Sequence, residues 1–230
     1  MRWAITRDDD GDQAPHDPWA EQRRAMVQRQ LRDRGIRNER VLEAMGRVPR
    51  EKFVPEDWRA QAYADRALPV GEGQTISQPY MVAVMLEMLD PRPENRVLEI
   101  GAGSGYQAAL LGELAGEVYT MEIVESLARR AEAILRDLGY ENVHVICGDG
   151  SLGYPARAPY DRIIVAAAAP QVPPPLREQL AVGGRLVAPV GSRYAQRCIL
   201  LERRAEGSAE TGGLECVFVP LRGEHGWQQE

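Results

Sequence analysis

The chain has 230 residues, of which 44% are hydrophobic, and this is enough to bury the core of one sizeable α/β domain. Its formal net charge of −6 argues against a general binder of nucleic acid or of membrane surfaces, because such binding depends on clustered cations. No apolar run approaches the ~18 residues that a membrane span needs, and the first residues lack the apolar stretch of a secretory signal. These features predict a soluble cytoplasmic protein.

The cysteines and histidines argue against a metal site. The cysteines form no C-x-x-C pair and lie too far apart to suggest a disulfide framework. The histidines do not cluster either. We therefore expect no metal ligand among Cys147, Cys198, Cys216, His16, His144 and His225.

The beginning of the chain predicts a tail followed by helices. Residues 1–20 are polar and rich in aspartate, so we expect a mobile acidic tail and a single folded domain over residues 21–230. Helical patterns cover residues 19–34, which end at Gly35, and residues 38–45. Their charged faces predict solvated surface.

The centre of the chain alternates between strands and helices. Apolar runs predict strands, and helical patterns separate most of them; this alternation is typical of a parallel sheet with right-handed crossovers. Two last apolar runs, separated by a Gly/Ser/Thr-rich region, predict an antiparallel hairpin at the sheet edge. The fold class is therefore α/β, a doubly wound and mostly parallel sheet with an N-terminal helical addition. The expected strands are residues 97–100, 118–121, 143–147, 162–167, 185–190, 198–202 and 215–219, and the expected helices are 106–115, 124–138 and 174–180.

A glycine-rich turn follows the first of these strands. Glu99 precedes Gly101, Gly103 and Gly105, and a helix comes next. Glycines let the backbone approach a ligand closely, and the helix N-terminus offers free N–H groups to an anion. A dinucleotide fingerprint, G-x-G-x-x-G, would need a glycine where Tyr106 stands. The spacing E-x-G-x-G-x-G instead resembles the S-adenosylmethionine (AdoMet) loop of Rossmann-like methyltransferases, although glycines used only for packing are the alternative.

Acidic residues also follow the next two strands. Glu122 ends the second strand, where a carboxylate accepts hydrogen bonds from both ribose hydroxyls of a nucleoside. NAD enzymes use the same contact, so Glu122 predicts a nucleoside without naming it. Asp149 and Gly150 follow the third strand, where an acid meets the adenine amino group and glycine leaves room for the ring. A strand-end carboxylate and an ordinary Asp-Gly turn are the alternatives.

A further segment upstream contains two hydroxyl side chains. Thr75 and Ser77 stand before Pro79, which begins a predicted helix over residues 80–89. Ser77 either caps this helix or takes part in chemistry. No G-x-S-x-G elbow, H-E-x-x-H motif, Walker loop or [DN]-P-P-[YFW] tetrapeptide is present, which removes support for hydrolases, NTPases and amino-directed DNA methyltransferases.

Several stretches together resemble the protein-L-isoaspartate O-methyltransferases. They occur in the order of the family over residues 23–227, and the Thr-Ile-Ser-x-Pro segment at residues 75–79 is specific to it. One departure is Arg222, where many members have threonine. The matching stretches are residues 48–55, 67–71, 74–81, 97–105, 148–150, 166–170 and 219–221.

The resemblance implies a site and a division of the domain. It implies an N-terminal helical and substrate segment over residues 21–90, an AdoMet-binding core over 91–190 and a C-terminal hairpin and cap over 191–230. Ser77 would be the catalytic residue. The implied cofactor contacts are Gln74, Thr75, Ile76, Glu99, Gly101, Gly103, Gly105, Glu122, Asp149 and Gly150, and the implied substrate contacts are Ile76, Ser77, Val219 and Leu221.

The resemblance also implies a reaction. Methyl transfer from AdoMet to the free α-carboxylate of an L-isoaspartyl residue would give S-adenosylhomocysteine and an ester that closes to a succinimide, which initiates protein repair. The expected partners are damaged proteins and peptides, with no nucleic acid or membrane, and we expect a monomer. The alternatives are a methyltransferase for a small molecule or nucleic acid, an NAD-dependent oxidoreductase and a binding module without activity.

Overall fold

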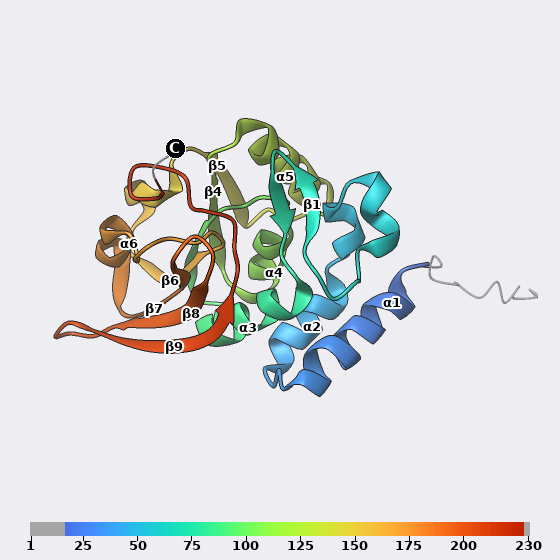
Figure 1. Cartoon of the computed structure of the whole chain (residues 1–230), viewed down its shortest axis with the longest axis horizontal. Helices are drawn as coiled ribbons and strands as arrows, with labels where there is room; N and C mark the ends of the chain where they lie inside the picture. The colour runs from blue at the N-terminus through green and yellow to red at the C-terminus, as the bar shows by residue number, and fades with distance from the viewer. Residues whose placement is uncertain (1–16, 228–230) are drawn as a thin grey trace, which may run out of the picture.

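The computed structural model describes residues 17–227 and contains a central sheet of seven strands. The strand order is β5-β4-β3-β6-β7-β8-β9 (Figure 1). The neighbours from β5 to β7 pair in parallel, and β8 and β9 continue the sheet in antiparallel pairing. This confirms the predicted doubly wound, mostly parallel sheet. The strands are β3 (Arg96–Ile100), β4 (Glu117–Glu122), β5 (Val143–Cys147), β6 (Tyr160–Val165), β7 (Leu180–Gly191), β8 (Gln196–Arg203) and β9 (Ser208–Cys216).

Both faces of the parallel strands are covered. Side chains alternate along a strand, so Val97 of β3 packs in one hydrophobic cluster while Leu98 and Ile100 pack in the other. The first cluster contains α3 (Pro79–Leu89), α4 (Tyr106–Leu114) and part of α5 (Glu125–Asp137). The second contains α6 (Pro174–Gln179), next to the short 3₁₀ segment Gly150–Leu152. Burial on both sides explains the nearly continuous apolar sequence of these strands.

The predicted N-terminal helices are present. The first comprises α1 (Ala20–Ala25), a π-helical turn (Met26–Leu31) and a 3₁₀ turn (Arg32–Arg34), and it stops at Gly35, whose φ is 99°. The second, α2 (Glu39–Arg47), begins after Asn38, whose side chain accepts hydrogen bonds from two backbone N–H groups. Two further 3₁₀ segments, Arg50–Phe53 and Glu56–Gln61, follow.

Part of the expected acidic tail belongs to this helical region. Residues 1–16 lie outside the described residues. Asp17 forms an ion pair with Arg23 (3.1 Å), and the Trp19 ring lies 6.4 Å from the Tyr63 ring. The folded structure therefore begins before residue 21, because Trp19 finds an aromatic partner far along the chain.

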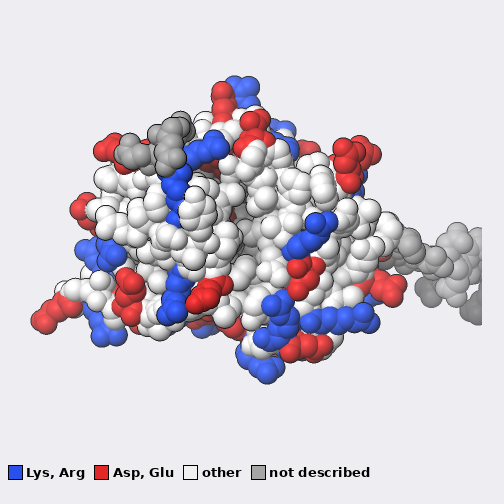
Figure 2. All heavy atoms as spheres, in the orientation of Figure 1, with Lys and Arg blue, Asp and Glu red and all other residues white. Residues whose placement is uncertain are grey.

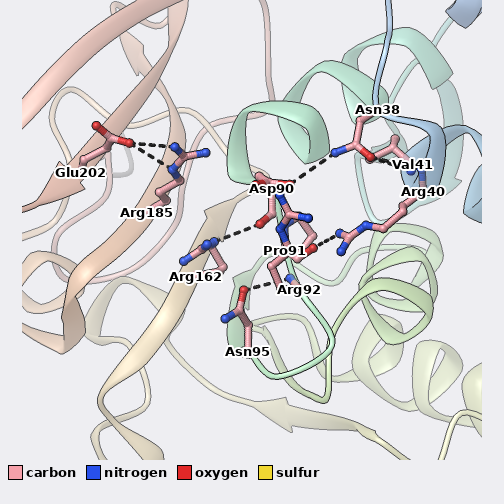
Figure 3. A network of polar contacts seen from close by, with 10 residues as sticks. All are labelled: Asn38, Arg40, Val41, Asp90, Pro91, Arg92, Asn95, Arg162, Arg185 and Glu202. Atoms are coloured by element: carbon pink, nitrogen blue, oxygen red, sulfur yellow. Dashed lines mark hydrogen bonds and ion pairs between the residues drawn. The ribbon is translucent and has the colours of Figure 1, made fainter.

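A polar network at the amino ends of the strands fixes the helical region to the sheet (Figure 3). The loop after α3 starts at Asp90, whose φ is 48°. Its side chain accepts a hydrogen bond from Asn38 (3.4 Å), and its carbonyl accepts one from Arg162 of β6 (3.2 Å). Arg40 of α2 donates to the carbonyl of Pro91 in the same loop. The opposite, carboxyl ends of the strands remain free for a ligand site.

A small second sheet was not predicted. β1 (Leu68–Gly71) and β2 (Gln74–Ile76) form an antiparallel hairpin, and Glu72 and Gly73 at its tip both have positive φ. These strands have four and three residues, which is too short for periodicity to reveal. Their place beside the core follows from the burial of Leu68, Val70 and Ile76.

The predicted C-terminal antiparallel hairpin is confirmed, but its second strand was placed wrongly at residues 215–219. The last strand, β9, runs over Ser208–Cys216 and includes the Gly/Ser/Thr-rich region that was expected to be the turn. This edge strand is mostly exposed, so backbone pairing with β8 determines it rather than an apolar pattern. Residues 217–227 leave the sheet, and we call them the C-terminal strap; in Figure 1 they are the red segment that runs from β9 toward the C-terminus.

Candidate functional site

A pocket lies at the carboxyl ends of β3, β4 and β6. The strand order reverses between β3 and β6, and this is where open α/β sheets bind ligands. The pocket contains about 810 Å³ of empty space, part of it open to solvent. Figure 2 shows the corresponding hollow near the centre of the molecular face, bordered mainly by uncharged residues. Most residues expected from the sequence line it: Gln74, Thr75, Ile76, Ser77, Gly101, Gly103, Glu122, Gly150, Val219 and Leu221.

The glycine turn forms one wall of the pocket. Gly101, Gly103 and Gly105 all have positive φ, at 94°, 52° and 88°. Residues with a side chain rarely adopt this backbone conformation, so the turn requires glycine at all three positions for its backbone shape and not only for packing. Gly105 is the N-cap of α4 and lies behind the pocket wall, where an added Cβ would be 3.2 Å from Ala131. The turn thus presents backbone and the start of α4 to the pocket.

Glu122 is held in place by the same turn. Only 6% of this residue is exposed, and its two carboxylate oxygens accept hydrogen bonds from Gly103 N (2.8 Å) and Val124 N (2.9 Å). Each carboxylate oxygen can accept more than one hydrogen bond, so both remain able to receive a hydroxyl donor. Glu122 is therefore an oriented acceptor pair in the pocket wall.

Glu99 lies beneath the pocket and not in its lining. The side chain is fully buried, and Oε2 accepts a hydrogen bond from Thr120 Oγ1 (2.6 Å). Oε1 has no hydrogen-bond partner among the described residues, and the same is true of the Gln107 amide nitrogen. Burial raises the pKa of Glu99 to about 8, and the nearby charge of Glu122 acts in the same direction.

Asp149 and Gly150 take different positions. Gly150 lines the pocket, and an added Cβ would stand 2.6 Å from the Ile100 side chain, so only glycine fits there. Asp149 is not in the lining: it accepts hydrogen bonds from Ser151 N (2.9 Å), Ser151 Oγ (2.7 Å) and Glu224 N (2.8 Å). Burial by itself would raise the pKa of Asp149, but these bonds hold it below the usual value. Asp149 thus ties the C-terminal strap to the loop after β5.

The C-terminal strap forms another wall. Ala168, just after β6, donates its N–H to the Val219 carbonyl (2.8 Å), and its own carbonyl accepts from Leu221 N (2.7 Å). The Trp227 indole donates to the same carbonyl (3.0 Å). Val219 and Leu221 therefore reach the pocket through backbone pairing with Ala168, in the segment that follows β6.

Ser77 stands opposite the strap, between β2 and α3. The helix begins after Gln78 without a side-chain cap, so the hypothesis that Ser77 caps it is wrong. The Ser77 hydroxyl has no hydrogen-bond partner within residues 17–227 and is half-buried. Ser77 also lines a second, open groove that includes Asp65, Met81 and Phe218. It therefore lies where the pocket meets a surface groove.

Other lining residues were not identified from the sequence. Tyr106 and Gln107 come from the first turn of α4, and their position directly after the glycine turn was the available signal. Met121, Val124 and Ala166 also line the pocket and lie at or just after the carboxyl ends of β4 and β6. No pattern in the sequence brings Arg222 to the pocket, because only the course of the strap decides it.

The comparison with family models decides the classification. Residues 21–226 match the model described as protein-L-isoaspartate(D-aspartate) O-methyltransferase (PCMT). The chain belongs to this family. The resemblance noted in the sequence is thereby confirmed over nearly the whole chain.

Individual members of the family are similar to this chain in sequence and in structure. A protein-L-isoaspartate O-methyltransferase from Roseiflexus sp. (strain RS-1) is 56% identical over 92% of this chain and 97% of its own length. One from Methanoregula boonei is 54% identical, with the same coverage of both chains. A solved protein-L-isoaspartate O-methyltransferase superposes with a TM-score of 0.79 at 30% identity, covering 88% of this chain and 66% of its own. A structure from Plasmodium falciparum, in complex with S-adenosyl-L-homocysteine, shares the fold with a TM-score of 0.75 at 24% identity, covering 87% of this chain and 98% of its own.

Replacing Glu99 by glutamine tests the buried carboxyl group. The folded protein keeps the proton up to about pH 8, whereas the unfolded chain releases it near the ordinary value of 4.5. The stability from this group is therefore fully present below pH 4.5 and is lost as the pH rises through 8. We compare the two proteins without ligand. Between pH 6 and pH 8, we expect the melting temperature of the wild type to fall by about 5 °C more than that of Glu99→Gln. Circular dichroism at both pH values measures this difference, and equal falls would contradict it.

Proposed function

We propose that this chain transfers a methyl group from AdoMet to the free α-carboxylate of L-isoaspartyl residues in damaged proteins and peptides. One observation carries the proposal: a pocket built around a glycine turn and an oriented Glu122 opens at Ser77 onto a surface groove. Such a site suits a nucleoside inside the pocket and an extended peptide outside it. The family membership and the names of the most similar relatives support the same activity.

The residues of the pocket fit this cofactor. The turn at Gly101 and Gly103, with the start of α4, would hold its amino-acid part, because free N–H groups at a helix start favour a carboxylate. Glu122 would accept the ribose hydroxyls, and the missing side chain at Gly150 would leave space for the adenine. When bound, AdoMet supplies an electrophilic methyl carbon on a sulfonium, which departs as the neutral thioether of S-adenosylhomocysteine.

The other expected cofactor contacts act from the edges of the site. Gln74, Thr75 and Ile76 would close the pocket from the side of β2. Gly105 would act through the turn and Glu99 from beneath it, since neither lines the pocket. Asp149 would reach the adenine amino group only through acceptor capacity that the strap leaves unused.

This reaction needs positioning more than proton transfer. The attacking α-carboxylate has an ordinary pKa near 3.5 and is already ionised at neutral pH, so no general base is required. We assign to Ser77 a hydrogen bond that its hydroxyl donates to this carboxylate and that orients one oxygen toward the methyl carbon. Ile76 on one side, and Val219 and Leu221 on the other, would hold the peptide and exclude water.

Selection of isoaspartate would be geometric. The isomerised residue adds one methylene to the main chain and carries a carboxylate directly on Cα. A normal aspartyl carboxylate extends one carbon farther from the backbone, so a peptide held in the groove presents it at the wrong place. The methyl ester formed from isoaspartate then closes to a succinimide with loss of methanol, which opens the way to repair.

We also propose a monomeric cytoplasmic enzyme that binds neither nucleic acid nor membranes. The net charge of −6 and the mainly uncharged border of the hollow in Figure 2 suit a peptide better than a polyanion. Among residues 17–227, no helix has the length and apolar character needed to cross a membrane.

One pair of peptides tests the activity. The peptides have the same sequence and differ only in an aspartyl or an isoaspartyl linkage at one residue. With labelled AdoMet, we expect the isoaspartyl peptide to form a base-labile methyl ester. The aspartyl peptide should form at least about a hundredfold less of this ester, because its carboxylate lies one carbon away from in-line alignment with the methyl group. The proposal would be rejected if both peptides were labelled equally, or if neither peptide were labelled.

Replacement of Glu122 by alanine tests the cofactor site. The variant loses the acceptor pair for the ribose, so we expect the affinity for S-adenosylhomocysteine to fall by about 10–100-fold. Glu117→Ala is the matched control, because Glu117 lies at the other end of the same strand and pairs with Arg96. Calorimetry of both variants measures the effect, and an unchanged affinity in Glu122→Ala would remove the ribose assignment.

Replacement of Ser77 by alanine tests the orienting hydroxyl. We expect kcat for the isoaspartyl peptide to fall by about 10–100-fold, the loss of one hydrogen bond to a charged group, with cofactor affinity unchanged. Ser126→Ala serves as control, because Ser126 bonds to Glu72 on the exposed surface. A Ser77→Ala enzyme with the wild-type kcat would show that another group orients the carboxylate.

A further inference from the structure

Arg50 is a buried cation directly behind the pocket. It begins the 3₁₀ segment Arg50–Phe53, and none of its surface is exposed. Its Nε donates to the carbonyl of Ala62 (2.7 Å) and its Nη2 to the carbonyl of Ser77 (2.8 Å). The guanidinium thus holds the backbone of the residue to which we assign the orienting hydroxyl.

The guanidinium also contacts a second part of the pocket wall. Its Cζ lies 4.8 Å from the ring centroid of Tyr106, which lines the pocket. Within residues 17–227, neither Nη1 of Arg50 nor the Tyr106 hydroxyl has a hydrogen-bond partner. Arg50 therefore joins the Ser77 side of the pocket to the start of α4.

The charge of Arg50 has no counter-ion in the described part of the chain. The adjacent Glu51 pairs instead with Arg23 (3.5 Å) and accepts a hydrogen bond from the Tyr63 hydroxyl. Within residues 17–227, no carboxylate forms an ion pair with Arg50. Burial lowers the pKa of Arg50 to about 10, so the group is still a cation at neutral pH. A buried cation without a partner is costly and is stabilised by any anion that comes near.

In the proposed function, the anion that arrives at Ser77 is the substrate carboxylate. We propose that Arg50 is a positioning residue with two effects: it fixes the Ser77 segment through the Ser77 carbonyl, and its buried charge favours a carboxylate over a neutral group at the mouth of the pocket. This inference rests on the proposed function. It assigns to Arg50 the recognition of negative charge, which the uncharged Ser77 hydroxyl does not provide.

A charge-matched pair of ligands separates this role from a purely structural one. The ligands are the isoaspartyl peptide and the same peptide with an α-carboxamide in place of the α-carboxylate. Their affinities are measured by calorimetry with S-adenosylhomocysteine present, and the ratio of the two is the preference for the anion. A loss of rigidity weakens both ligands, whereas a loss of charge lowers the ratio.

We expect Arg50→Met to lower this ratio by about tenfold or more, the size of one charge acting at short range in a partly buried site. Its affinity for S-adenosylhomocysteine is measured as well, so that both peptides are compared at saturating cofactor. Arg50→Lys keeps the charge but not the two-carbonyl geometry, so it should keep most of the ratio and show a kcat reduced about tenfold. Arg23→Met is the matched control: it disturbs the neighbouring buried network without touching Ser77 and should leave the ratio unchanged.

Each result decides one point. A wild-type enzyme that fails to methylate the isoaspartyl peptide overturns the proposed function. A wild-type enzyme that methylates it, together with an Arg50→Met variant that keeps the full ratio, overturns the role of the charge. Wild-type kcat in Arg50→Lys overturns the positioning of Ser77. If Arg50→Met does not fold, the neutral Arg50→Gln variant takes its place in the same comparison.

Discussion

The backbone turn after β3 is the constraint on which the site depends. Its three glycines in positive-φ conformations let the chain leave the sheet and enter α4 with a tight bend that lies against the pocket. The N–H of Gly103 in this turn also fixes the carboxylate of Glu122 (2.8 Å). The turn therefore sets both the shape of the pocket and the direction of its main polar group.

Two segments far apart in the sequence complete the pocket. The β1–β2 hairpin brings Ser77 to one side, and the C-terminal strap brings Val219 and Leu221 to the other. On the first side, the Ser77 carbonyl accepts a hydrogen bond from Arg50. On the second, backbone N–H groups of the strap donate to Asp149 and Ser151. The hydrogen bonds that hold the Ser77 segment and the strap do not use the Ser77 hydroxyl, which is thus left available for a substrate.

The buried ionisable groups have opposite tendencies. Burial favours the neutral form of Glu99, Arg50 is a cation with no carboxylate partner among residues 17–227, and Glu122 accepts hydrogen bonds from backbone N–H groups. A site with this distribution suits a reaction in which an anion meets a cationic electrophile and both charges disappear in the products. In the proposed reaction, positioning and charge complementarity would take the place of acid–base catalysis.

The sequence by itself determined the sheet, its helices and the residues of the glycine turn, because strand and helix periods and glycine spacing are local signals. It also identified Ser77, Glu122 and Gly150, which stand at element ends. It did not reveal the β1–β2 hairpin or the extent of β9, since three-residue strands and exposed edge strands have no apolar period. Only the tertiary structure decided that Asp149 holds the strap, that Arg222 reaches the pocket and that Arg50 lies behind Ser77. The hydrogen bonds that hold the strap and Ser77 join residues 75 and 27 positions apart, and no local pattern encodes where the backbone brings them together.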